Sequence, residues 1–294
     1  MSGALAEAAK GQEPVGGRDH LSQRDFARLA EFIQRYSGIR MPSSKATMVE
    51  GRLRRRLQAT GIPSLKDYCR YLFEDGGLEL ETVHLIDAVT TNKTEFYREP
   101  KHFDILNEKV LPEIADSRRI TNKEPLKIWS AACSTGAEPY TLAMVASEFA
   151  QGLFGLHTSI IATDLCTSVL ETGITGIYPT TAISPVPRSA RQRYLMYARD
   201  MSRDLVRIVP ELRSIVKYGR LNLMDETYAV DDDMDIIFCR NILIYFDKPT
   251  QEKVLARLCA HLRPGGYLFL GHSESLAGSQ LPVKPIGHAA FRRI

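Results

Sequence analysis

The stretch LKIWSAACSTG, residues 126–136, decides the fold class of this chain. Residues 126–129 predict a strand, the small residues 130–136 predict a turn, and residues 138–149 predict a helix. A strand that passes through a short turn into a helix is the building unit of parallel α/β sheets. The segment therefore predicts an α/β domain.

The same succession of strands and helices recurs toward the C-terminus. The predicted elements are a strand at 159–164 with a helix from Ser168, a strand at 234–239 with a helix at 250–262, and a strand at 267–270 after a turn at 264–266. Strands that alternate with helices of about 10 to 15 residues indicate a parallel sheet with helices on both faces.

Residues 176–220 interrupt this alternation. They contain a predicted short helix at 190–197 and two β-rich runs, 205–209 and 215–218. Two such runs a few residues apart predict antiparallel strands. We therefore expect a small antiparallel β-subdomain inserted into the α/β fold.

Residues 21–90 carry a helical pattern. Ser22 is a predicted N-cap, a second helix from about residue 45 to 60 ends at Gly61, Ser64 opens a third helix, and a fourth follows. The prediction is a disordered leader (1–20), an all-α domain (21–90), a linker with a helix (91–120) and the α/β domain (121–294).

Composition excludes several classes of protein. The chain is 44% hydrophobic and 25% charged, as in globular proteins that bury a core. It has no run of about 18 apolar residues, so we expect no membrane insertion, and its N-terminus lacks the apolar stretch of a signal peptide. The net charge of +3 does not indicate a nucleic-acid-binding protein.

The cysteines and histidines point to a cytoplasmic protein without a metal. The five cysteines are scattered, and none forms a CxxC pair, which indicates reduced thiols. The seven histidines show no HxxxH or HExxH spacing, so we expect no metal site. Cys133 and Cys239 are interpreted as pocket-lining thiols, and His272 as a packed histidine.

Three segments should meet where the predicted parallel strands end, because ligands of such sheets bind outside the carboxyl ends. These are the turn 130–136, Asp164 at the end of the second strand, and residues 235–241. The turn has one glycine and is followed by Glu138, which argues against a dinucleotide pyrophosphate and favours a ligand with an ammonium group. A carboxylate at the position of Asp164 suits ribose hydroxyls. Together the segments predict a nucleoside cofactor.

The sequence also contains five characteristic motifs: NKTEFYR (92–98), STGAEPY (134–140), ATD (162–164), FCRNILIYF (238–246) and GHSE (271–274). In order and spacing they resemble the motifs of the CheR chemoreceptor methyltransferases, from about Leu21 to the C-terminus. The resemblance implies a Rossmann-like domain that binds S-adenosylmethionine, carries a small antiparallel β-subdomain and is preceded by an all-α domain. It implies methylation of glutamate side chains on the cytoplasmic helical bundle of chemoreceptors.

The resemblance also assigns roles to matching positions. Contacts to S-adenosylmethionine are implied for Asn92, Thr94 and Arg98 from the linker, Glu138 at the methionyl ammonium, Asp164 at the ribose, Asn222 and Leu223 at the adenine, and Arg240 and Asn241 at the methionine end. Ala137 departs from the pattern, because some relatives have a second acid there.

The implied reaction requires no strong base, since a glutamate carboxylate with a pKa near 4.3 is ionised at neutral pH. It can attack the sulfonium methyl group directly, so the enzyme mainly supplies orientation and desolvation. Arg98 and Tyr245 are the candidates for positioning that carboxylate. The alternatives are a salt bridge from Arg98 to Glu95 or Glu99, and a core role for Tyr245.

Docking of the receptor is predicted on the second helix, where Arg52, Arg55 and Arg56 share one side. The alternative is a solvated basic face. A receptor C-terminal peptide could add to the β-subdomain as a strand, which the sequence leaves open. We expect a cytoplasmic monomer recruited to receptor arrays. Two other functions stay open here: a similar methyltransferase with another protein or a small molecule as substrate, and a non-catalytic sensor of the cofactor.

Overall fold

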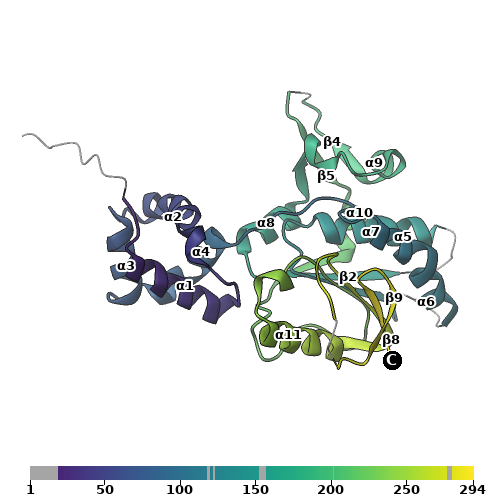
Figure 1. Ribbon diagram of the computed structural model, residues 1–294. Helices are drawn as coiled ribbons and strands as arrows, with labels where there is room; N and C mark the ends of the chain where they lie inside the picture. The colour runs from purple at the N-terminus through teal and green to yellow at the C-terminus, as the bar shows by residue number, and fades with distance from the viewer. Residues whose placement is uncertain (1–18, 118–119, 122, 152–156, 201, 277–279) are drawn as a thin grey trace, which may run out of the picture.

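The computed structural model describes residues 19–117, 120–121, 123–151, 157–200, 202–276 and 280–294. Most of the predicted leader lies outside these residues. The described part divides into an all-α domain, a sheet domain with helices on both faces, and a small β-subdomain that projects from the sheet domain (Figure 1). The fold class predicted from the sequence is therefore confirmed.

Three helix boundaries of the all-α domain lie at the predicted signals Ser22, Gly61 and Ser64. The domain contains α1 (Gln23–Ser37), α2 (Ala46–Thr60), α3 (Leu65–Phe73) and α4 (Leu78–Val89). The side chains of Ser22 and Ser64 accept the backbone N–H groups of Asp25 and Asp67, and Gly61 ends α2 in the left-handed conformation. These local caps explain why the helix boundaries could be placed from the sequence.

The linker forms α5 (Lys101–Ile105), a π-helical turn (Leu106–Val110) and α6 (Leu111–Ser117). These elements lie against the sheet together with α7 (Ala137–Ala150) and α10 (Pro210–Ile215). On the other face lies α11 (Lys248–His261), whose buried side chains belong to the same cluster as those of the all-α domain. Both faces of the sheet are thus covered, as the sequence predicts.

The main sheet has seven strands in the order β6-β2-β1-β7-β8-β10-β9. The strands are β1 (Leu126–Ala131), β2 (Thr158–Asp164), β6 (Val216–Arg220), β7 (Met234–Cys239), β8 (Leu262–Leu270), β9 (Val283–Gly287) and β10 (Ala290–Arg293). The first five in spatial order are parallel, β10 is antiparallel to β8, and β9 at the edge is antiparallel to β10. The order reverses between β1 and β7, so the carboxyl ends of these strands form a binding crevice.

The β-subdomain differs in detail from its prediction. It is a three-stranded antiparallel sheet, β3-β5-β4, made of β3 (Ile177–Pro179), β4 (Leu195–Tyr197) and β5 (Leu205–Ile208). The predicted pairing of run 215–218 with run 205–209 is wrong. Ile215 ends α10, and residues 216–218 lie in β6, which pairs in parallel with β2 in the main sheet, because α10 separates the two runs.

Two smaller boundaries also differ. The helix predicted at 190–197 is observed as α9 (Arg188–Tyr194). Residues 195–197, which were predicted as the end of that helix, form β4 instead. The predicted turn 264–266 lies within β8, which begins at Leu262 and shifts register against β7. Between β2 and the subdomain lies α8 (Thr167–Thr175), near the predicted Ser168.

The all-α domain and the sheet share one apolar core. Leu29 and Leu53 of the helices belong to the same buried cluster as Trp129 of β1. Gly38 lies at the contact between the domains with φ of 75°, and a Cβ there would lie 2.7 Å from Met224 Sδ and 3.0 Å from the Phe246 ring. Close packing at this point requires a residue without a side chain.

Gly38→Ala and Gly61→Ala form a matched pair, because both glycines end a helix in the left-handed conformation. A Cβ at Gly61 would meet nothing within 4 Å, so its replacement should cost about 1 kcal/mol of unfolding free energy. Gly38→Ala should cost about 3 kcal/mol, since Met224 and Phe246 must also move. Urea unfolding followed by circular dichroism measures both. Equal losses would contradict the close contact between the domains.

Candidate active site

A pocket of about 1030 Å³, including solvent at its mouth, opens at the carboxyl ends of β1, β2 and β7. The all-α domain contributes Ser37, Ile39, Met41, Lys45, Val89 and Thr90, and the linker contributes Thr91 to Thr94 and Arg98. The sheet domain contributes the remaining lining residues, among them Asp164 and Arg240.

The structure brings ten of the predicted site residues together in this one pocket. They are Asn92, Thr94, Arg98, Glu138, Asp164, Asn222, Leu223, Arg240, Asn241 and Tyr245. The three predicted docking arginines do not line it.

Asp164 lies at the end of β2 and holds the turn after β1. Its Oδ2 accepts the backbone N–H of Ser134 at 2.8 Å, and its Oδ1 accepts that of Cys166 at 2.9 Å. Burial raises the pKa of this carboxyl above its ordinary value, and the backbone hydrogen bonds oppose that rise. A carboxylate has about four lone-pair sites, so Asp164 can still accept hydroxyl groups from a ligand.

Ser134 connects the turn to the linker. Its hydroxyl donates to the backbone carbonyl of Asn92 at 2.9 Å, and the Asn92 side chain lies 3.3 Å from both Thr90 Oγ1 and Cys166 Sγ. On the other side of the pocket, Asn222 Nδ2 donates to the Tyr36 carbonyl at 2.6 Å. Asn222 thus contacts the all-α domain as well as lining the pocket.

Glu138 and Arg240 form a buried ion pair at the methionine end of the predicted site. Arg240 Nε donates to Glu138 Oε2 at 2.6 Å, and Ser130 donates to Glu138 Oε1 at 2.7 Å. Both residues are 7% exposed. Glu138 thus binds a protein cation, and a ligand ammonium would share it with Arg240.

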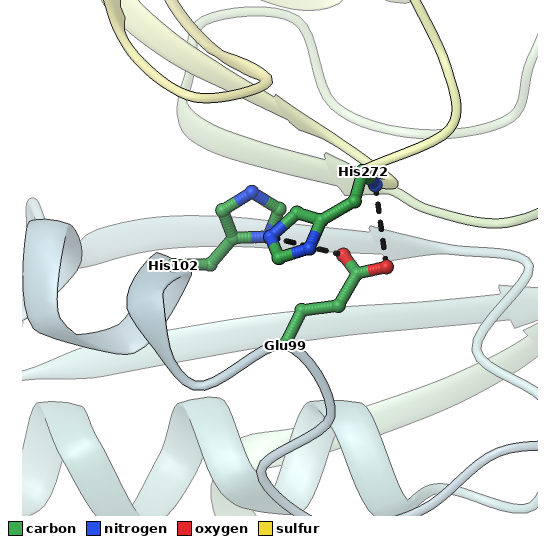
Figure 2. Close-up of side chains that lie close together, drawn as sticks. All are labelled: Glu99, His102 and His272. Carbon is green, nitrogen blue, oxygen red and sulfur yellow. Dashed lines mark hydrogen bonds and ion pairs between the residues drawn. The ribbon is translucent and has the colours of Figure 1, made fainter.

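Glu99, His102 and His272, which were not among the predicted site residues, lie close together (Figure 2), and Glu99 and His102 contact the other side of Arg240. Arg240 Nη1 lies 3.4 Å from Glu99 Oε2 and 3.2 Å from His102 Nδ1. The sequence feature that could have revealed this cluster is the i, i+3 spacing of Glu99 and His102 at the start of α5. The atoms of these three residues that could bind a metal ion lie within 4.8 Å of one another. The cation that Glu99 and His102 contact in this structure is the guanidinium of Arg240.

His102 is neutral in this arrangement. Its Nε2 donates to the His288 carbonyl at 3.1 Å, so Nδ1 is the acceptor for Arg240. Burial, and then the positive charge of Arg240, lower the pKa of His102 to about 4. Burial alone would raise the pKa of Glu99. Hydrogen bonds from the Asn241 side chain and the His272 backbone, together with the positive charge of Arg240, outweigh burial and hold this pKa below its ordinary value.

Glu274 of the GHSE motif holds the loop that carries Asn241. Its carboxylate accepts the backbone N–H groups of Gly271 at 2.6 Å, Asn241 at 2.9 Å and Leu243 at 2.7 Å. Asn241 has φ of 58°, in the left-handed region. The buried carboxylate therefore stabilises a loop conformation that its sequence alone does not favour.

Arg98 and Tyr245 lie at the same pocket without strong partners. Arg98 Nη1 donates to the Lys93 carbonyl at 2.8 Å, and neither Glu95 nor Glu99 is within ion-pair distance among the described contacts. Lys45 Nζ lies 5.5 Å from the centroid of the half-buried Tyr245 ring. Cys133 and Cys239 are fully buried, and burial raises the pKa of both thiols well above the ordinary value.

The predicted basic face of α2 is only partly free. Arg52 Nη1 donates to the carbonyls of Val89 and Thr90 at 2.6 and 2.7 Å. Arg56 forms a double ion pair with the buried Glu81, at 2.7 and 2.8 Å. Arg55 is exposed. The periodicity of a helix shows which side of it a residue occupies, but not which residues of other elements contact that side.

The low pKa of His102 predicts how stability depends on pH. In the unfolded chain, this side chain titrates near its ordinary pKa of about 6.5. The contribution of His102 to the unfolding free energy is therefore fully present above that pH and is lost as the pH falls toward 4. His102→Asn keeps an acceptor for Arg240 but cannot titrate. Compared with the native chain, this variant should lose about 2 kcal/mol less unfolding free energy between pH 7 and pH 5.

Urea unfolding at both pH values tests this, with His84→Asn as the control because His84 is exposed on α4. The control should keep the pH dependence of the native chain. An identical pH dependence in His102→Asn would contradict the assignment of a neutral, buried His102.

Comparisons with known proteins agree with this geometry. Residues 92–291 match the family described as CheR methyltransferase, SAM binding domain, and residues 24–90 match its all-alpha domain. The chemotaxis protein methyltransferase 2 of Pseudomonas aeruginosa is 36% identical over 280 residues, covering 95% of this chain and 96% of the relative. The chemotaxis protein methyltransferase of Salmonella typhimurium is 39% identical, covering 87% and 85%. The chain therefore belongs to the CheR family and is an S-adenosylmethionine-dependent methyltransferase.

Proposed function

We propose that this methyltransferase esterifies glutamate side chains on the cytoplasmic helical bundle of chemoreceptors. Relatives named chemotaxis protein methyltransferases support this substrate. Within the described residues, no helix has both the length and the apolar character needed to cross a bilayer. We infer that the enzyme meets its substrate through recruitment to receptor arrays. A methyltransferase for another protein or a small molecule is the competing function.

The pocket has groups that fit S-adenosylmethionine. We infer that Asp164 binds the ribose hydroxyls, that Asn222 and the buried Leu223 border the adenine, and that Glu138 faces the ammonium group. Asn92, Thr94 and Asn241 complete the lining. When bound, the cofactor supplies a methyl group on a positively charged sulfur.

The contrast between Arg98 and Arg240 carries the proposal. The charge of Arg240 is neutralised by Glu138 and Glu99, at 2.6 and 3.4 Å. Among the described contacts, Arg98 donates only to a neutral carbonyl, so its positive charge stays available to an incoming carboxylate. We infer that Arg98 orients the substrate glutamate, with Tyr245 donating its hydroxyl. The carboxylate oxygen then forms the new C–O bond as the carbon–sulfur bond breaks.

The β-subdomain supports a second contact with the receptor. Strands β3 and β4 are the outer strands of its sheet, so each has a free edge within the described residues. Apolar side chains on these strands and on β5 are exposed, including Ile177, Met196, Tyr197 and Leu205 at 40 to 54%. A receptor C-terminal peptide could add to such an edge as a strand.

The experiment is transfer of radiolabelled methyl groups to membranes rich in receptors. The expected product is receptor-bound label that base releases, as for a glutamyl ester. Arg98→Ala should lower turnover by about 100-fold, because the carboxylate loses its orientation, and should change cofactor affinity by less than about threefold. Calorimetry with S-adenosylhomocysteine measures the affinity.

Label on a small molecule or on other proteins, with none on receptors, would support the competing function. Equal losses of turnover and cofactor affinity in Arg98→Ala would instead assign Arg98 to cofactor binding alone. Receptors without the C-terminal tail serve as a second substrate, which separates docking at the β-subdomain from the methyl transfer itself.

We further propose that Arg55 contributes to receptor docking, as the exposed member of the three predicted arginines. Attraction between a cation and an acidic bundle mainly raises the encounter rate and is screened beyond about 8–10 Å at physiological salt. Arg55→Glu should raise the receptor KM about fivefold at low salt and weaken its salt dependence. Arg54→Glu is the control, since Arg54 is also exposed but projects about 100° around α2 from Arg55, where its Nη2 donates to the Asp19 carbonyl.

Initial methylation rates against receptor concentration, at low and moderate salt, measure this effect. Cofactor affinity should not change, because Arg55 lies outside the pocket. Equal KM values for the two variants would show that the exposed side of α2 is merely solvated.

A further inference from the structure

Asp87, in the last turn of α4, binds the sheet domain from the all-α domain. Its Oδ1 accepts the backbone N–H of Thr167 at 2.9 Å, and its Oδ2 accepts the N–H of Ser168 at 3.3 Å. The Thr167 hydroxyl donates to Oδ2 as well. Thr167 and Ser168 are the first residues of α8, 80 and 81 positions further along the chain.

This contact supplies a helix cap from another domain. The N-cap position of α8 is Cys166, and its side chain makes no capping hydrogen bond. The first N–H groups of a helix have no partner within the helix, so they need an acceptor from elsewhere. Asp87 is that acceptor for Thr167 and Ser168.

Asp164 binds the preceding N–H of the same turn. The N–H of Cys166 donates to Asp164 Oδ1 at 2.9 Å, whereas those of Thr167 and Ser168 donate to Asp87. Two carboxylates, one from each domain, therefore share the first turn of α8. One of them is the pocket residue to which the ribose is assigned.

The position of Asp87 is unfavourable for its own helix. A carboxylate in the last turn lies at the negative end of the helix dipole, where cations are preferred. Asp87 also lies close enough to Asp164 to contribute to the raised pKa of that carboxyl, after the larger effect of burial. Asp87 is thus unfavourable both for α4 and for the ionised form of Asp164. We therefore expect its contact with α8 to compensate for these two costs.

The segment after Asp87 forms one wall of the pocket. Val89, Thr90 and Asn92 follow within five residues and line the cavity. A second contact lies across the pocket, where Arg220 and Asn222 donate to Tyr36 at 2.9 and 2.6 Å, just before the lining residue Ser37. Beside the shared apolar core, these two polar contacts each lie next to residues that the all-α domain adds to the pocket.

We propose that Asp87 is a positioning residue for the cofactor pocket, which holds the all-α domain against α8 and so sets cofactor affinity. If the closed arrangement is populated for only a fraction of the time, the apparent dissociation constant rises by the inverse of that fraction. Loss of the cap should therefore weaken cofactor binding without altering the groups that perform the reaction.

Three variants test this: Asp87→Ala removes the cap, Thr167→Val removes only the hydroxyl donor, and Glu79→Ala removes an exposed carboxylate from the same helix. Asp87→Ala should raise the dissociation constant of S-adenosylhomocysteine about tenfold, measured by calorimetry. Thr167→Val should raise it less, and Glu79→Ala should leave it unchanged. In methylation assays, the KM for the cofactor should rise while kcat is retained at saturation.

Small-angle scattering adds a readout of the domain arrangement. Asp87→Ala should have a larger radius of gyration than the native chain without ligand, and the native value with saturating S-adenosylhomocysteine. A folded Asp87→Ala variant with native affinity and native dimensions would overturn the proposal, and so would a loss of kcat at unchanged cofactor KM. If Asp87→Ala does not fold, Thr167→Val decides, and native affinity in that variant overturns the proposal.

Discussion

The buried guanidinium of Arg240 is the interaction on which the pocket depends. It joins Glu138 at the start of α7, Glu99 and the Arg98 carbonyl of the linker, and His102 of α5. A buried cation without such acceptors would cost several kcal/mol. The linker, α7 and the end of β7 are consequently fixed relative to one another before any ligand binds. The rings of Phe103 and Phe238, 5.3 and 5.5 Å from the guanidinium carbon, complete its surroundings.

Backbone strain accumulates around the same place. Tyr97, Glu99, Ala132, Ser134 and Asn241 have positive φ values of 51 to 58°. For residues with a side chain this conformation costs about 1–3 kcal/mol each and persists only where other contacts enforce it. Here the contacts are visible, because Asp164 accepts the N–H of Ser134 and Glu274 accepts that of Asn241. Two buried carboxylates thus stabilise the strained turns that shape the pocket.

The parts of the fold that could be predicted are those with a local physical signal. Caps such as Ser22 and Gly61 mark helix ends, and the carboxyl ends of parallel strands meet at one edge, which places the turn after β1, Asp164 and residues 235–241 together. The other pocket residues, such as Asn92 and Asn222, were implied by the resemblance of the motifs and not by strand geometry. The sheet to which residues 215–218 belong could not be predicted, because it depends on pairing with β2 more than fifty residues earlier. The roles of Arg52 and Arg56 were hidden for the same reason, since their partners lie 25 to 38 residues away.

The titratable groups in and around the pocket serve geometry more than proton transfer. His102 stays neutral because its pKa is about 4, and burial raises the pKa values of Cys133 and Cys239 well above the ordinary value. Near neutral pH these three side chains therefore stay uncharged. A methyl transfer to an ionised carboxylate needs no proton to be removed. A site whose buried groups do not titrate keeps its shape and its field constant, which is what a reaction governed by orientation requires.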